Sequence, residues 1–201
     1  QIQHYTIALF SMPTFMCSGS YRKFRNYFYT QAFFKKGMMF NASHFADVSD
    51  RWGVSFTVWD NNLGLNNALP IQLKDIENFQ IVDREIKHFY NSDDREASEW
   101  VRKEIKGLKT FDAPQMSSGL KIKESNMCRG KSIPNSLGYF TSFANVIQES
   151  SEGVILTSSA GSRGNGFSII PENFKKVCAL FSARKLTVDT WDTHQDEYLA
   201  P

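Results

Sequence analysis

The chain has 201 residues, of which 41% are hydrophobic and 22% are charged, and its formal net charge is +2. This composition is typical of a chain that folds around a hydrophobic core, and it excludes an intrinsically disordered protein. The small net charge excludes attraction of nucleic acid by the molecule as a whole, so an anionic partner must meet a local basic patch.

The cysteines and histidines give no sign of a metal site or of a disulfide framework. Cys17, Cys128 and Cys178 are odd in number and far apart, and the four histidines are scattered along the chain. No apolar run approaches the ~18 residues of a membrane span, and the first residues lack the basic start of a signal peptide. We therefore expect a cytoplasmic protein that contacts no membrane and binds no metal.

Both ends of the sequence predict a segment cut from a longer protein. Gln1 is not an initiator methionine, and an apolar strand pattern starts almost at once. The other end stops just after a charged and aromatic cluster, "WDTHQDEYLAP".

The first half of the chain is expected to alternate between strands and a helix. Residues 5–13 form a nearly continuous apolar run, typical of a strand that is buried on both faces of a parallel sheet. Residues 21–31 carry aromatic side chains at helical spacing, with basic side chains on the other side and Ser20 as the expected N-cap. Residues 33–41 and 53–61 are predicted to be strands.

Between these two strands lies a polar loop that carries two large aromatic residues, Phe45 and Trp52. Two interpretations are open from the residues alone. The rings could close one end of the sheet against the rest of the chain, or they could be exposed for stacking on a ligand.

The second half has a different pattern from about residue 68. Residues 92–109 are predicted to be a surface helix, with Asp93 and Glu96 at capping-box spacing. A long irregular stretch, 112–139, comes next, and loops of this length in compact domains are usually functional or disordered. A strand at 153–159, a glycine-rich loop at 161–166 and a helix at 169–186 complete the pattern.

No local catalytic signature is present, but residues 5–60 resemble the middle of the adenine-N6 DNA methyltransferases of bacterial restriction-modification systems. The resemblance rests on Tyr21-Arg22-Lys23-Phe24-Arg25 at the start of the helix, on "GMMFNASHF" (37–45) and on "WGVSFTVW" (52–59). The later stretches "SSGLKIKESN", "IPNSLGYF" and "GNGFSIIPENFKKVCALFSARKL" look like the region that follows the catalytic domain when target recognition is C-terminal.

The resemblance implies an α/β fold in two parts. Residues 1–66 would form the closing part of a doubly wound methyltransferase sheet with an antiparallel last strand. Residues 67–201 would form an α+β region that recognises the DNA target. The strand at 5–13 would then expose an apolar edge, so we expect association with the missing N-terminal half of the methyltransferase or with another copy.

The resemblance also implies a function. In this family the target adenine is extruded from double-stranded DNA, and a Phe in the loop between the last two strands stacks on it; Phe45 occupies that position. The family's methyl donor is S-adenosylmethionine. Neither its Gly-rich turn nor the Asn/Asp-Pro-Pro-Tyr tetrapeptide is present in this sequence. The parent protein is thus expected to be the enzyme, and this segment alone should be inactive, with no catalytic residue and no cofactor of its own.

Three basic stretches of the second half are candidates for contacting DNA phosphates. Each has a plain alternative, because charges on loops and on helix surfaces are usually only solvated. The candidates are Lys121, Lys123, Arg129 and Lys131 in the irregular stretch, Arg163 in the glycine-rich loop, and Lys175 and Lys176 in the last helix.

Two other functions remain open from the sequence. The longer protein could methylate RNA or protein instead of DNA. Residues 68–201 could instead be a protein-interaction module without catalytic activity, which the many aromatic residues and the small net charge would also allow.

Overall fold

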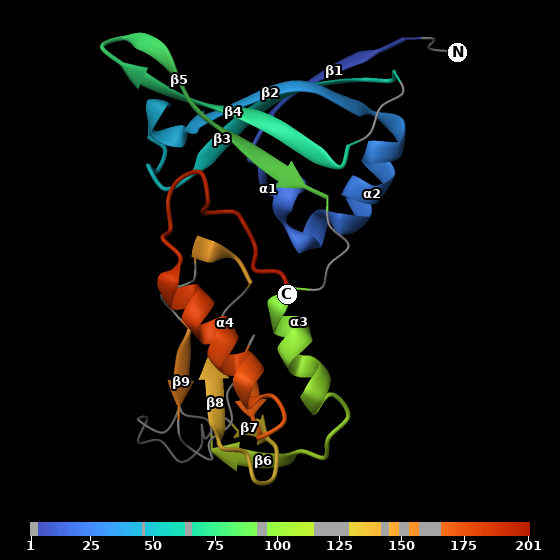
Figure 1. The fold of residues 1–201 in the computed structure, drawn as a ribbon, viewed down its shortest axis with the longest axis vertical. Coiled ribbons are helices and arrows are strands. Elements are labelled where there is room, and N and C mark those ends of the chain that lie inside the picture. The colour runs from blue at the N-terminus through green and yellow to red at the C-terminus, as the bar shows by residue number, and fades with distance from the viewer. Residues whose placement is uncertain are drawn as a thin grey trace. The chain divides into compact units, whose positions relative to one another are not determined.

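The computed structural model describes residues 4–45, 47–62, 66–91, 96–114, 129–141, 145–148, 153–156 and 166–201. The chain divides into two compact units. Unit 1 comprises Gln1–Asp93 and Asp189–Glu197, and unit 2 comprises Asp94–Val188 and Tyr198–Pro201. The protein is of the mixed α/β class, with a mixed five-stranded sheet in unit 1 and two smaller sheets in unit 2 (Figure 1).

The sheet of unit 1 has the strand order β1-β3-β2-β4-β5. β3 pairs antiparallel with both of its neighbours, β2 and β4 pair in parallel, and β4 and β5 pair antiparallel. The predicted strands at 33–41 and 53–61 are confirmed, and so is the antiparallel direction of the second of them. The strand bounds are β1 Thr6–Ser11, β2 Phe33–Asn41, β3 Gly53–Asp60, β4 Ala68–Glu77 and β5 Gln80–Tyr90.

The prediction for the first strand was wrong in two respects. β1 pairs antiparallel with β3, not in parallel, and it is not buried on both faces, although its position at the edge of the sheet agrees with the exposed edge that was expected. Its residues alternate between exposed and half-buried, and the ring of Phe10 is 58% exposed. A continuous apolar run fits an edge strand as well as a central one, because the run alone does not reveal whether the second face is covered.

Two short helices and one longer helix connect β1 to β2 on one face of the sheet (Figure 1). They are α1 Thr14–Cys17, the 3-10 turn η1 Gly19–Tyr21 and α2 Arg22–Gln31. The predicted helix is confirmed, but the residue that caps this region is Ser18, whose side chain accepts a hydrogen bond from the backbone N–H of Ser20.

The side of α2 that faces the sheet also differs from the prediction. Arg25 and Tyr29 are buried, whereas Tyr27 is 70% exposed and Phe28, its alternative on the expected apolar face, packs against the core. Arg25 can be buried because its guanidinium donates to the carbonyl oxygens of Phe15 and Ser18 and to Asn91 Oδ1.

Trp59 of β3 is fully buried at the centre of the unit 1 core. Its ring stacks on Tyr29 with 5.5 Å between the centroids, and the rings of Phe28 and Phe34 meet it edge-on. Its indole N–H donates to Thr57 Oγ1 at 2.8 Å, which satisfies the polar atom inside an apolar core.

The boundary expected after residue 66 is not where the compact units divide. β4 and β5 extend the sheet of β1 to β3, so unit 1 runs on to residue 93. The segment Asp189–Glu197 also belongs to unit 1, where Glu197 accepts hydrogen bonds from Ser18 Oγ and from the backbone N–H of Gly19, both at 2.9 Å.

Unit 2 packs helices α3 and α4 against small sheets. The helix expected at 92–109 is shorter, α3 Ala97–Arg102 followed by the 3-10 turn η3 Lys103–Ile105, and Asp93 lies outside the described residues. The stretch expected to be irregular contains strands. The helix expected at 169–186 is present but begins only at Phe174, and Ile169 belongs to a strand. The remaining elements are β6 Phe111–Pro114, β7 Arg129–Ser132, β8 Gly138–Thr141, β9 Val154–Leu156, β10 Phe167–Ile169 and α4 Phe174–Leu186.

Candidate nucleic-acid interface

The loop between β2 and β3 is closed by hydrogen bonds at its base. Asn41 accepts from the backbone N–H of Ser43 and donates to the carbonyl oxygen of Asp50, both at 2.8 Å. The backbone N–H of Ala42 donates to the carbonyl oxygen of Trp52 at 2.7 Å. The side chain of Asn41 therefore holds the two ends of the loop together, a common role of Asn in turns.

Phe45 lies on this loop and is 41% exposed. Its ring centroid is 5.6 Å from that of Phe10, in an edge-on arrangement, and 5.4 Å from that of Phe40. The ring is thus held by two neighbours from strands of the same sheet, and part of it is open to solvent. Trp52 is 42% exposed.

A second feature of unit 1 lies on the sheet face opposite to the helices. Side chains of β2, β3 and β4 surround a cavity of about 320 Å³ there. Met38, Phe56 and Val58 provide its apolar part, and Lys36, Gln72 and Lys74 provide its polar part. The ammonium group of Lys74 makes an ion pair with Asp83.

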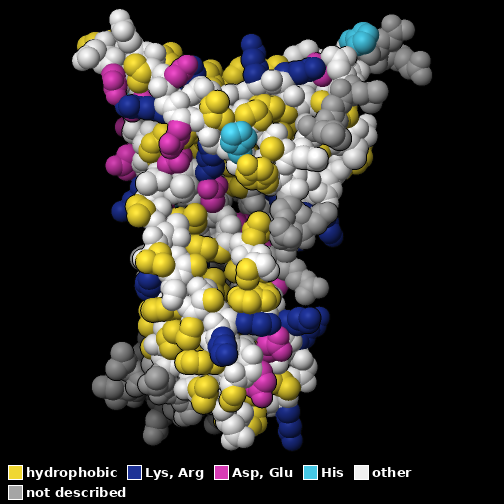
Figure 2. Space-filling model, in the orientation of Figure 1, with side chains coloured by type: hydrophobic (Ala, Val, Ile, Leu, Met, Phe, Trp, Pro, Cys, Tyr) yellow, Lys and Arg dark blue, Asp and Glu magenta, His cyan; other side chains and the backbone are white. Residues whose placement is uncertain are grey.

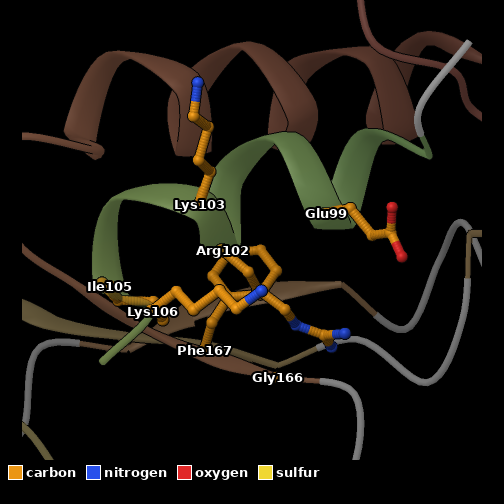
Figure 3. Close-up of a pocket in the computed structure, with 7 residues that line it drawn as sticks. All are labelled: Glu99, Arg102, Lys103, Ile105, Lys106, Gly166 and Phe167. Atoms are coloured by element: carbon orange, nitrogen blue, oxygen red, sulfur yellow. The ribbon is translucent and has the colours of Figure 1, made fainter. Parts of the chain in front are cut away.

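Unit 2 holds a larger cavity, of about 820 Å³, beside α3 and η3. Arg102 and Lys106 line it together with the ring of Phe167, and Figure 3 shows these three side chains on one side of the helix, with Lys103 pointing away from them. The guanidinium carbon of Arg102 lies 5.7 Å from the centroid of the Phe167 ring. Glu99 adds one carboxylate to the lining, so the cavity is basic in balance.

The residues predicted to contact DNA fall into three groups. Lys121, Lys123 and Arg163 lie outside the described residues, and for Arg129 only the backbone, in β7, is described. Lys131 makes an ion pair with Asp112 across the β6–β7 pair. In α4, Lys175 is exposed, whereas Lys176 pairs with Glu104 and lies 5.2 Å from the centroid of the Trp100 ring.

The carboxylate partners weaken two of these candidates. Hydrogen bonding by Lys176, and then its charge, lower the pKa of Glu104, so this carboxylate stays ionised beside the ammonium group. Lys131 and Lys176 can meet a phosphate only in competition with Asp112 and Glu104, whereas Lys175 is exposed. Arg184 of the same helix is buried.

Sequence reasoning missed Arg102 and Lys106. Both lie within the stretch that was predicted to be a surface helix, where charged side chains are expected and carry no specific signal. Their proximity to Phe167, about sixty positions further along the chain, follows from the packing of unit 2 and from no local pattern.

Comparison with models of protein families and with curated proteins found no match to this chain. Within the part of the chain that the structure describes, no helix is long and apolar enough to cross a membrane. In the same part, no three His, Cys, Asp or Glu side chains come together in a group that could hold a metal ion.

Proposed function

We propose that this chain is a segment of an S-adenosylmethionine-dependent adenine-N6 DNA methyltransferase of a restriction-modification system. In this proposal unit 1 contributes the loop that contacts the extruded adenine, and unit 2 contributes contacts to double-stranded DNA. Two features support it: the family resemblance of residues 5–60, and the antiparallel pairing of β3, the last of the three strands that carry that resemblance.

The observation that carries the proposal is the position of Phe45. It directly follows the 3-10 turn Ala42–His44 that comes after β2, on a loop whose base is closed by Asn41, and its ring is partly open to solvent. An extruded base needs an aromatic surface of this kind, and stacking of one base on such a ring contributes about 1–3 kcal/mol. Because the hydrogen bonds of Asn41 already hold the loop, less conformational entropy of the loop would be lost when the base stacks on the ring.

Methyl transfer itself is assigned to the parent protein. The Gly-rich turn and the Asn/Asp-Pro-Pro-Tyr tetrapeptide of the family do not occur in this sequence, so the residues present do not fit the cofactor and we derive no transfer step for them. The doubly wound sheet of the family likewise remains part of the proposal. The expected work of this chain is to bind DNA and to hold the extruded base.

The test is fluorescence anisotropy of labelled DNA duplexes titrated with the full chain at several salt concentrations. We expect binding that weakens as salt rises and that is tighter for a duplex with a mismatched adenine, since an unpaired base costs less to extrude. Phe45→Ala should lose the preference for the mismatch. Phe79→Ala is the matched control, because this ring is fully exposed on the turn between β4 and β5 and should leave the preference unchanged.

Unit 2 is tested in the same assay through its basic cavity. Lys106→Gln should lower the slope of the logarithm of affinity against the logarithm of salt concentration by about one, as expected for one lost phosphate contact. Lys109→Gln is the control, since Lys109 does not line this cavity. Equal affinity for both duplexes together with an unchanged slope in Lys106→Gln would contradict the proposal.

A protein-interaction module is the second candidate, and one observation favours it. The sheet face of unit 1 opposite to the helices carries exposed apolar side chains, among them Phe10 and Met38. Binding of a protein to this face would not weaken steeply with salt, which separates it from binding to DNA phosphates.

A further inference from the structure

The turn between β4 and β5 places a large aromatic ring where the backbone favours glycine. Glu77 and Gln80 are the last residues that pair across this hairpin, so Asn78 and Phe79 form the turn. Their φ angles are 50° and 61°. Positive φ at both turn residues is the mark of a type I′ turn, in which Asn-Gly is preferred because glycine adopts this conformation freely. Phe79 is thus unfavourable for the backbone, and its ring buries no surface in return, since the residue is fully exposed.

Two further apolar side chains flank this ring. Ile76 and Ile81 pair directly across the hairpin and are 47% and 73% exposed. The register of β2 with β4 covers only Gln72–Lys74, so from residue 75 onward β4 and β5 continue as a two-stranded ribbon (Figure 1). We call residues 76–81 the Phe79 tip. The tip is a projecting apolar end of the hairpin and not a face of the sheet.

The ribbon behind the tip is held by ion pairs and is acidic in balance. Arg84 pairs with both Asp75 and Glu77, and Lys74 pairs with Asp83. Figure 2 shows Asp and Glu side chains gathered at this end of unit 1, with hydrophobic side chains among them. Residues 74–85 contain four carboxylates and two basic side chains, so with His44 beside Asp75 counted as neutral an excess of two negative charges remains.

This charge selects among the partners that could receive an apolar tip. The phosphates of nucleic acid or of an anionic membrane surface would be repelled by the carboxylates. A protein cavity with a basic rim is complementary to the tip, and unit 2 of the same chain has one. It is the cavity of about 820 Å³ beside α3, where Arg102, Lys103 and Lys106 stand against one carboxylate, Glu99, among the described residues of the lining. A cavity of this size has room for a ring and its flanking side chains.

The lining of this cavity suits an aromatic ring. Arg102 and Lys106 lie on the same side of the helix (Figure 3), and their methylene stems, with the half-buried Ile105, provide apolar surface. The face of a phenylalanine ring attracts cations of this kind, as the contact of Arg102 with Phe167 within unit 2 illustrates.

A second cavity of unit 2, of about 530 Å³, is less complementary. Glu104 and Glu172 line it together with Lys109, so it would oppose carboxylates to those of the tip.

We propose that the Phe79 tip of one copy of this chain inserts into the basic cavity of unit 2 of a second copy. The ring of Phe79 would lie against the stems of Arg102 and Lys106, and the carboxylates behind the tip would face their charges. Because the two contacting surfaces differ, the contact is heterologous and joins copies head to tail. The inference goes beyond the DNA proposal and does not rest on it.

Sedimentation velocity of the full chain without DNA tests this contact. The weight-average mass should rise with concentration above the 23.0 kDa of one chain, and it should rise less at high salt. Phe79→Gly should weaken association by at least about tenfold, as expected when the central aromatic of a contact is removed, without lowering the midpoint of urea unfolding. Asn78→Gly is the matched control, because it changes the same turn and keeps the ring.

The cavity is tested by charge reversal and by mixing. Lys106→Glu should weaken association as well, whereas Lys109→Glu, which replaces a lysine outside this cavity, should not. A mixture of Phe79→Gly and Lys106→Glu chains should form a dimer that neither variant forms alone. In that mixture the tip of the Lys106→Glu chain meets the intact cavity of the Phe79→Gly chain, and no other complementary pair is left.

Three results would overturn the proposal. A mass of one chain at every concentration would leave the tip to a different polypeptide. Association that Phe79→Gly does not weaken would show that copies meet through another surface. Association that Lys106→Glu does not weaken, with a mixture no heavier than either variant alone, would assign the tip to another cavity, such as the one on the unit 1 sheet. None of these measurements contains DNA, so this proposal and the DNA proposal can fail separately.

Discussion

Replacement of Arg25 by methionine should destabilise unit 1 by about 3 kcal/mol. Arg25 is 3% exposed, and burial lowers the pKa of its guanidinium. Its three acceptors are the carbonyl oxygens of Phe15 and Ser18 and the side-chain oxygen of Asn91. Methionine fills nearly the same length but donates no hydrogen bond, so these oxygens lose their donor. One buried unsatisfied acceptor costs about 1–3 kcal/mol, and Asn91 can recover part of the loss from water.

Hydrogen exchange measured by mass spectrometry on peptides from β2 and β3 reads out the stability of unit 1 separately from that of unit 2. A loss of about 3 kcal/mol corresponds to exchange that is faster by about 100-fold in the strands that open only on global unfolding. Lys23→Met is the control, since Lys23 is an exposed neighbour on α2. Exchange that differs less than about threefold between the two variants would refute the reasoning that Arg25 organises α1 and α2.

The remaining predictions concern other polar groups. Burial, and next the charge of Asp196, raise the pKa of the Cys17 thiol to about 12. Alkylation of Cys17 by iodoacetamide at pH 8 should therefore be slower than alkylation of a peptide thiol by at least ~100-fold. The difference should disappear when urea unfolds the chain. Burial raises the pKa of Asp196 despite the opposing charge of Lys87. A raised folded-state pKa contributes stability that is complete below about pH 3.9 and is lost as pH rises through that pKa. In urea denaturation, the free energy of unfolding of the wild type minus that of Asp196→Asn should therefore fall from pH 4 to pH 7. A difference that grows with pH would show that the Lys87 ion pair dominates. Lys176→Met should leave the urea midpoint nearly unchanged, because its ion pair with Glu104 is partly exposed.

The two central strands of the resemblance could be predicted because their sequences are unambiguous. Residues 53–60 alternate in the structure between buried and half-buried, and their β-branched and aromatic residues favour a strand on either face. The face of α2 could not be predicted from periodicity. Hydrophobicity places Arg25 in solvent, and only the three oxygen acceptors supplied by α1, η1 and Asn91 make its burial favourable.

β5 was missed for a different reason. Residues 80–90 of β5 are mostly charged or exposed, including Asp83, Arg84 and Glu85, because this strand lies at the edge of the sheet and buries little of its surface. Charged side chains are a common feature of edge strands, which they protect from pairing with other chains. The signal that marks a strand in a sequence is therefore weakest where the strand contacts the protein least. The domain boundary was expected too early, after residue 66, because β4 and β5 were not recognised as strands of the same sheet.

For the candidate site, the sequence indicated which residues to consider but not which residues surround them in the fold. It singled out Phe45 because no neighbouring apolar residues in the polar loop would bury such a large aromatic ring. It could not identify Phe10 and Phe40 as its neighbours, since these contacts depend on β1 and β2 lying on either side of β3. For the basic residues it counted charges but could not show their pairing, which is why Lys131 and Lys176 turn out to have carboxylate partners.

The two interpretations of Phe45 are compatible in physical terms. A ring that stacks on an extruded base has to be held in place beforehand, because ordering it on binding would cost conformational entropy. The edge-on contact with Phe10 and the tilted contact with Phe40 restrict the ring while 41% of the residue stays exposed. Partial burial between two neighbours is compatible with a stacking role, and the Phe45→Ala variant tests whether the ring has one.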